Sequence, residues 1–134
     1  MSQPLRLGKY DIVGFVSIVD VPRAKEFYRD TLGLTLLSEE PPFALVFDAH
    51  GIMLRLGMAK EIVPAHGTVL GWNVPDIVAA VKGLSDAGVH FERYPPMKQD
   101  NMGIWTAPGG AKVAWFKDPD GNILSVSEHP EWKK

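Results

Sequence analysis

The sequence predicts an α+β fold made of two tandem βαβββ modules, each of about sixty residues. The first observation is a repeated order of signals: a β-branched run, an aspartate, an apolar stripe with helical spacing, and a glycine. This order occurs at residues 12–33 and again at residues 68–88. The second observation is a closing hairpin around the turn at residues 118–122. Either module alone would have a marginal core, so we expect the two to pair.

The first module begins with a predicted strand over residues 12–19, an uninterrupted apolar and β-branched run. Asp20 follows as a helix N-cap, and Pro22 falls in the first turn, where its missing N–H costs nothing. An apolar stripe at helical spacing extends to Leu32, and Gly33 supplies a left-handed stop. Further strands are predicted over residues 34–38, 43–48 and 52–56, with a tight turn at residues 48–51.

The second module repeats this order after a predicted linker at residues 64–67. A strand is predicted over residues 68–74, Asp76 is a second N-cap, and Gly88 is a second stop. The interval between cap and stop matches that of the first module within one residue, which favours an internal repeat. The remaining strands are predicted over residues 89–94, 103–106, 113–116 and 123–126.

The domain organisation follows from these elements. We expect a lead-in at residues 1–9, a single domain at residues 10–128 and a tail at residues 129–134. Module one covers about residues 10–63 and module two about residues 68–128.

Composition is that of an ordinary globular protein. Of 134 residues, 46% are hydrophobic and 22% are charged, which is enough for one well-buried core. No apolar run is long enough to span a membrane and no signal-peptide pattern is present, so we expect a cytoplasmic protein without a membrane partner. The net charge of −2 with scattered basic residues gives no nucleic-acid footprint. The absence of cysteine excludes disulfides and thiolate metal sites.

Three motifs carry a family resemblance: VDVPRAKEFYRDTLGL at residues 19–34, VPDI at 74–77 followed by AGV at 87–89, and DPDGN at 118–122. Together they resemble the vicinal oxygen chelate superfamily, which includes glyoxalases, bleomycin-resistance proteins and extradiol dioxygenases. The resemblance covers about residues 10–128. It implies that the two modules form a curved eight-stranded cup with the helices outside, often in a dimer.

Enzymes of this superfamily hold a divalent metal with four inward-facing His or Glu side chains. Carried over through the resemblance, these positions fall on Val13, Val69, Arg55 and Ser125. Two of these side chains are aliphatic, one is a permanent cation and one is a neutral hydroxyl, so none is an ordinary metal ligand. We therefore predict no metal, no cofactor and no catalytic residue at these positions.

Strand alternation predicts which other side chains line the cup. If the four family positions face inward, Phe15, Met53 and Asn73 face inward with them, whereas Trp72 faces the helices. The side chains of the closing hairpin depend on its register, since a slip of one residue exchanges the two faces.

A closing turn with only two central residues would pair Ala114 with Ser125. Both would then face the cup together with Phe116, while Trp115 and Leu124 would face the helices. We adopt this register as the prediction.

Arg55 is the principal candidate for ligand binding. An unpaired buried guanidinium costs several kcal/mol, so we expect it to have a partner. That partner is either a carboxylate, phosphate or phenolate of a ligand, or an acidic side chain of the protein or of a second copy.

Tyr94 and Trp105 flank a segment rich in proline and methionine that has the composition of a mobile rim. They are candidate stacking groups for a flat ligand, although a flap that covers a partner subunit has the same composition. We expect His66 in an exposed loop, and His90 and Glu92 on a solvated strand face. Alternatively, these three side chains could hold a metal ion at a site displaced from the family positions.

The leading hypothesis is a metal-free, glyoxalase-like or bleomycin-resistance-like homodimer that binds a small aromatic or anionic molecule in the cup. One alternative is a metal-dependent lyase or dioxygenase of the same superfamily with displaced ligands. Another is a dimeric interaction domain whose cup is filled by its own side chains. The candidate ligand-binding residues are Arg55, Phe15, Met53, Asn73, Tyr94, Trp105, Phe116 and Ser125.

Overall fold

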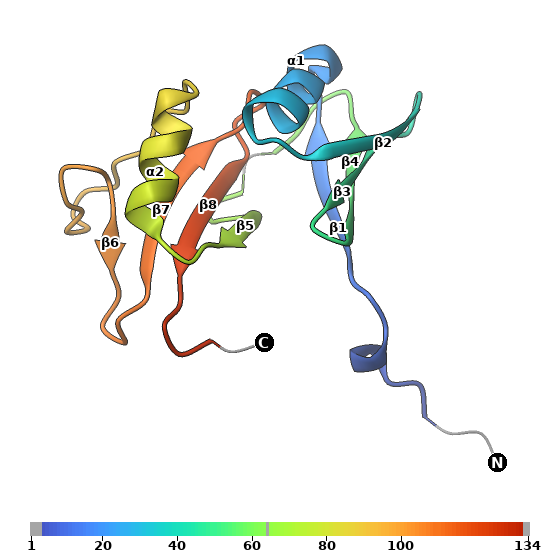
Figure 1. Ribbon diagram of the computed structural model, residues 1–134. Helices are drawn as coiled ribbons and strands as arrows, with labels where there is room; N and C mark the ends of the chain where they lie inside the picture. Colours follow the sequence, from blue (N-terminus) through green and yellow to red (C-terminus); the bar gives the residue numbers. More distant parts are fainter. Residues whose placement is uncertain (1–3, 64, 133–134) are drawn as a thin grey trace.

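The computed structural model describes residues 4–63 and 65–132. It contains two α-helices and two four-stranded sheets, one sheet from each predicted module (Figure 1). The α+β class and the order of the two modules are confirmed. Within the described residues, no strand of one sheet is hydrogen-bonded to a strand of the other. Parts of the predicted lead-in, linker and tail, at residues 1–3, 64 and 133–134, lie outside the described residues.

The first sheet has the strand order β1-β4-β3-β2, with β1 parallel to β4 and the other neighbours antiparallel. Helix α1 (Val21–Glu26) begins after Asp20, whose carboxylate accepts a 3.2 Å hydrogen bond from the Arg23 N–H. A π-helical turn (Phe27–Thr31) continues this helix, and Gly33 ends it with a φ of +79°. The strands are β1 (Val13–Ile18), β2 (Thr35–Glu40), β3 (Ala44–Ala49) and β4 (Ile52–Met58).

The second sheet repeats this arrangement with the strand order β5-β8-β7-β6. Helix α2 (Ile77–Asp86) begins after Asp76, whose carboxylate accepts a 3.1 Å hydrogen bond from the Ala79 N–H. The predicted strand at residues 89–94 is wrong: this segment forms only an isolated bridge, from Phe91 to Phe116. The strands are β5 (Leu70–Asn73), β6 (Trp105–Thr106), β7 (Lys112–Lys117) and β8 (Ile123–Glu128).

Each sheet has a buried face and an outer face. On β1, Val16 and Ile18 are buried, whereas Phe15, which precedes them, is 70% exposed. On β8, Leu124 and Val126 are buried in the same way. One contiguous core joins the buried faces of both sheets to the helices. Its members include Val16, Ile18, Ala24, Tyr28, Leu45, Phe47, Leu54, Leu56, Ile77, Val81, Phe116, Leu124 and Val126.

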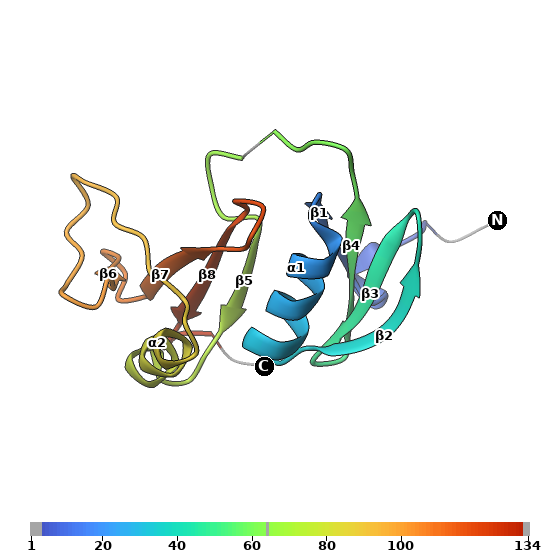
Figure 2. The ribbon, with the colours of Figure 1, turned by 90° about the horizontal axis from the view of Figure 1, so that it is seen from above.

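Helix α1 lies between the two sheets, as Figure 2 shows from above. Phe27, which follows α1, packs against Phe116 of the second module, with 6.4 Å between the ring centroids. Across the same interface, the Asn122 amide donates a 2.9 Å hydrogen bond to the Ser17 carbonyl oxygen. The helix side of each module therefore faces the other module, and the outer faces of the two sheets are left free.

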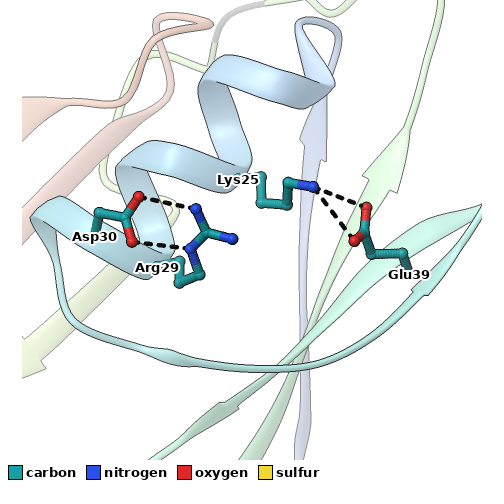
Figure 3. Close-up of polar contacts among 4 residues, drawn as sticks. All are labelled: Lys25, Arg29, Asp30 and Glu39. Carbon is teal, nitrogen blue, oxygen red and sulfur yellow. Dashed lines mark hydrogen bonds and ion pairs between the residues drawn. The ribbon is translucent and has the colours of Figure 1, made fainter.

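Ion pairs on the surface of α1 and of the π-helical turn accompany this packing. Lys25 Nζ lies 3.2 Å from Glu39 Oε1 and connects α1 with β2 (Figure 3). Arg29 and Asp30 form a second pair in the same view, at 2.8 Å. The Arg29 hydrogen bond lowers the pKa of Asp30. Water screens these exposed charges, so we assign the position of α1 to its buried contacts.

The register of the closing hairpin differs from the prediction by one residue. Trp115, rather than Ala114, pairs with Ser125, and Phe116 pairs with Leu124. The turn is longer than expected because the Asp118 N–H bonds the Asn122 carbonyl oxygen at 3.0 Å, so that residues 118–122 all lie between the strands.

This register corrects three side-chain assignments. Ala114 and Phe116 are both 0% exposed and lie in the core, so their predicted places on the cup face are wrong. Trp115 takes the outer face instead, next to Ser125. None of the helices in the part of the chain that the structure describes is long and apolar enough to cross a membrane.

Candidate functional site

The outer face of the first sheet brings together three of the predicted ligand-binding residues. Phe15 of β1 lies in register with Arg55 of β4. Met53, two residues before Arg55 on the same strand, lies on the same face. Phe15 and Met53 are exposed, as is Val13 at the start of β1. The outer face of the first sheet therefore presents exposed apolar side chains beside Arg55.

Arg55 has a partner within the protein. Its Nη2 lies 2.8 Å from Glu40 Oε1 at the end of β2, and the side chain is 28% exposed. The hydrogen bond from Arg55 holds the pKa of the Glu40 carboxyl below its usual range. Of the two kinds of partner that the sequence left open, this one is internal. A guanidinium carries five N–H donors in a planar fork, so the Glu40 contact leaves donors for a second anion.

The outer face of the second sheet carries three aromatic residues from three segments. Trp115 of β7 lies 6.1 Å from Trp105 of β6 and 5.7 Å from Tyr94, measured between ring centroids. The Trp115 indole N–H donates a 3.0 Å hydrogen bond to Thr68 Oγ1, which fixes the ring. We call Tyr94, Trp105 and Trp115 the aromatic platform. Because the three rings contact one another, they form a continuous surface on which a flat ligand can stack, and they do not enclose it.

Polar residues lie beside the aromatic platform on the same sheet. Ser125 lies between Trp115 and Gly71 in one cross-strand row, and it is 6% exposed. A Cβ added to Gly71 would lie 2.6 Å from Ser125 Oγ, so the glycine makes room for this hydroxyl. Asn73 is exposed at the end of β5, in the next row. The predicted residues Ser125 and Asn73 thus share a sheet with the platform.

Tyr94 is the least satisfied polar group of the platform. Its phenolic oxygen is buried, and no group among residues 4–63 and 65–132 hydrogen-bonds to it. Burial raises the pKa of Tyr94, and the charge of Glu92 raises it further. The phenol is therefore held in its neutral form, able to donate one hydrogen bond.

The residues considered for a displaced metal site do not come together. His90 lines a groove beside α2, while Glu92 lies 3.8 Å from Lys117 Nζ. His66 is exposed in the loop before β5. In the described part of the chain, no group of three or more His, Cys, Asp or Glu side chains is placed to hold a metal ion.

The structure also reveals site residues that the sequence analysis missed. Trp115 belongs to the platform and Thr68 accepts its indole hydrogen bond, yet alternation with the wrong hairpin register placed the Trp115 side chain against the helices. The signal was present in the Asp118 and Asn122 side chains, which favour a longer turn by bonding to the backbone.

Comparisons with known proteins place these features in context. The family model described as the Glyoxalase/Bleomycin resistance protein/Dioxygenase superfamily matches residues 12–126. The uncharacterized protein YraH of Bacillus subtilis (strain 168) is 28% identical over 122 residues, covering 80% of this chain and 88% of that protein.

Two solved structures are similar in fold. A lactoylglutathione lyase from Agrobacterium tumefaciens superposes with a TM-score of 0.65 and 20% identity, covering 90% of this chain and 96% of that chain. A glyoxalase family protein from Bacillus anthracis superposes with a TM-score of 0.70 and 16% identity, covering 96% and 99%. Identities this low show a shared fold only.

Proposed function

The chain belongs to the glyoxalase/bleomycin resistance protein/dioxygenase superfamily, and from this we propose that it is a metal-free binding protein for a small aromatic or anionic molecule. The observation that carries the proposal is the aromatic platform of Tyr94, Trp105 and Trp115 on the outer face of the second sheet. Arg55 occupies the equivalent face of the first sheet. A flat ligand stacks on the platform and places its acidic group toward the guanidinium.

A second copy of the chain completes the cup in this proposal. In one chain, helix α1 lies between the two sheets (Figure 2), so we place the opposite wall of the cup on a second copy. Pairing the first sheet of one copy with the second sheet of another would bury Val13, Phe15 and Met53, all exposed in the single chain. Covering one such side chain contributes about 1.5–3 kcal/mol.

The four positions at which the superfamily resemblance implies metal ligands do not fit a divalent ion. Val13 and Val69 offer no donor atom, and Arg55 is a cation already bonded to Glu40 at 2.8 Å. A lone Ser125 hydroxyl is a weak ligand unless it is deprotonated. These residue types support recognition by stacking and charge, without a metal.

The orphan phenol of Tyr94 gives the platform directional chemistry. A neutral phenol donates one hydrogen bond, and a buried donor without an acceptor costs about 1–3 kcal/mol. A ligand oxygen that accepts this bond removes that cost. Aromatic carboxylates and phenolates meet the three requirements of a flat ring, an acceptor oxygen and a negative charge.

Calorimetric titration with 2-naphthoate, salicylate and 4-nitrophenolate tests the proposal. We expect saturable binding of at least one compound, and its loss in the Trp105→Ala variant. Phe43→Ala is the matched control, because Phe43 is an exposed aromatic residue before β3 and does not belong to the second sheet. The proposal fails if none of the compounds binds, or if Trp105→Ala binds as the wild type does.

Elemental analysis of protein purified without chelators or an affinity tag provides a separate check. We expect a metal content near zero, before and after soaking with Zn, Ni, Mn or Fe. A content of about one ion per chain would favour the lyase or dioxygenase alternative instead.

A further inference from the structure

Tyr94 and Trp105 reach the aromatic platform from two separate segments of the chain. Tyr94 ends the segment 92–94, which is tied to β7 by a 2.8 Å hydrogen bond from the Glu92 N–H to the Trp115 carbonyl oxygen. Trp105 begins β6, a strand of only two residues at the edge of the sheet. Neither segment is as long as an ordinary strand, so the sheet ladder contributes few hydrogen bonds to the placement of these two rings.

The side chain of Gln99 lies between these two segments and bonds to both. Its Oε1 accepts a 2.7 Å hydrogen bond from the Tyr94 N–H. Its Nε2 donates hydrogen bonds to the carbonyl oxygens of Glu92, at 3.0 Å, and Gly103, at 2.8 Å. A primary amide has one oxygen and two N–H donors, so Gln99 uses all of them on the backbone of the segments that carry Tyr94 and Trp105.

The three partners fix the orientation of this amide. A backbone N–H can only donate and a carbonyl oxygen can only accept, so exchanging Oε1 and Nε2 would break all three bonds. The backbone of Gln99 also forms an isolated antiparallel bridge with Trp105. Gln99 therefore takes the place of strand pairing between the segment 92–94 and the start of β6.

The residue after Gln99 anchors the same loop. Asp100 Oδ1 accepts 2.9 Å hydrogen bonds from the N–H groups of Met102 and Ile104. Arg93 Nη1 donates a 2.6 Å hydrogen bond to the Asp100 carbonyl oxygen. These bonds hold the backbone beside Gln99, so the amide reaches its three partners from a fixed point.

We propose that Gln99 is a positioning residue of the ligand site: it holds Tyr94 and Trp105 where both rings lie against Trp115, at 5.7 and 6.1 Å between centroids. It acts through these rings and does not itself contact the ligand. With the amide in place, the platform is formed before a ligand arrives, and binding does not have to order its rings. This inference rests on the proposed function, in which a flat ligand stacks on the platform.

The arrangement of the rings can be measured without a ligand. The planes of the Trp105 and Trp115 rings are inclined by 33° at their 6.1 Å separation. Two indoles this close couple their electronic transitions, which gives a pair of bands of opposite sign in the far-ultraviolet circular dichroism spectrum. The difference spectrum between the wild type and Trp105→Phe isolates this couplet.

Gln99→Met keeps the approximate size of the side chain but removes its acceptor and both donors. We expect this variant to lose most of the couplet and to bind 2-naphthoate about tenfold more weakly in calorimetric titrations, because the ligand must then order the rings itself. Asn101→Leu is the matched control: it removes an amide from the same loop at an exposed position, and should leave the couplet and the affinity unchanged.

Urea unfolding establishes that each variant is folded under the conditions of these measurements. Gln99→Asn replaces Gln99→Met if that variant does not fold. Its amide is one methylene shorter and cannot reach both segments, so we expect the same loss of couplet and affinity. A residue with only a structural role would lower the stability of the fold and leave the couplet intact.

Two results would overturn the proposal. One is a wild-type couplet in a folded Gln99 variant, and the other is loss of the couplet with unchanged affinity for 2-naphthoate. If the wild type binds none of the aromatic anions, the proposed function fails, and the couplet still decides whether Gln99 places the rings. The two failures are therefore distinguishable.

Discussion

The phenolic hydroxyl of Tyr28, in the first module, donates a 2.8 Å hydrogen bond to Oδ2 of Asp118, in the second. Tyr28 is 0% exposed and Asp118 is 4% exposed, so the contact is shielded from water. The same carboxylate accepts hydrogen bonds from the backbone N–H groups of Asp120 and Asn122 and from the Asn122 amide. Asp118 thus shapes the closing turn and joins the modules at once.

Replacing Tyr28 with phenylalanine removes one donor from this buried carboxylate. We expect the free energy of unfolding to fall by about 1–3 kcal/mol, the cost of leaving a buried polar group short of a partner. Urea unfolding followed by circular dichroism measures this change. Tyr10→Phe is the control, since Tyr10 is exposed and should lose nothing. Equal midpoints for the two variants would contradict a role of the hydroxyl in stability.

Alkaline pH should weaken the same contact. Burial, and then the charge of Asp118, raise the pKa of Tyr28 above its ordinary value of 10.0. The phenol stays protonated in the folded protein while it ionises in the unfolded chain, so its contribution is present below pH 10 and decreases above it. The slope is about 1.4 kcal/mol per pH unit. The gap in stability between wild type and Tyr28→Phe should therefore narrow above about pH 10.

The exposed Phe15 side chain predicts that the chain associates with a second copy in solution. If the outer face of the first sheet is a dimer contact, Phe15→Lys should weaken association by about 1.5–3 kcal/mol, because a charge replaces a buried ring. Sedimentation velocity over a dilution series measures this. Val78→Lys, at an exposed apolar position of α2, should leave association unchanged. A wild type that is monomeric at every concentration would refute the shared cup.

Glu40 controls how much of Arg55 is available to an anion. Glu40→Gln removes the competing charge, so the affinity for 2-naphthoate should rise severalfold, by about 1 kcal/mol or less, as expected for an exposed pair. Titration calorimetry at neutral pH, where the carboxylate of the ligand is ionised, measures this effect.

Glu39→Gln is the matched control for this experiment. Glu39 is paired with Lys25 at 3.2 Å rather than with Arg55, so its replacement should not change anion affinity. If Glu40→Gln also leaves the affinity unchanged, Arg55 does not contact the ligand.

Sequence reasoning succeeded where a feature depends on neighbouring residues. Asp20 and Asp76 each cap a helix by bonding the N–H three positions ahead, and this requires only a short side chain at the right place. Gly33 and Gly88 end the two helical segments with positive φ, which other residues adopt at a cost. These local rules were enough to predict the repeat and the order of the elements.

Sequence reasoning failed where partners are distant in the chain. The partner of Arg55 is Glu40, on another strand, and a register shift between Leu36 and Ser38 sets the position of Glu40. The register of the closing hairpin depends on the Asp118 carboxylate, which accepts hydrogen bonds from residues of the turn and also from Tyr28. Residues 89–94 have strand composition, but only Phe91 finds a strand to bridge.

The position of Asp118 also matters during synthesis on the ribosome. The partners of Tyr28, Asp20 and Ser17 are Asp118, Asp120 and Asn122, all in the last fifth of a chain of 134 residues. During translation, the first module therefore leaves the ribosome long before the residues that complete its contacts have been made. A chain that ends before this turn lacks the acceptor for Tyr28, and we expect proteases to cleave it more readily than the full chain.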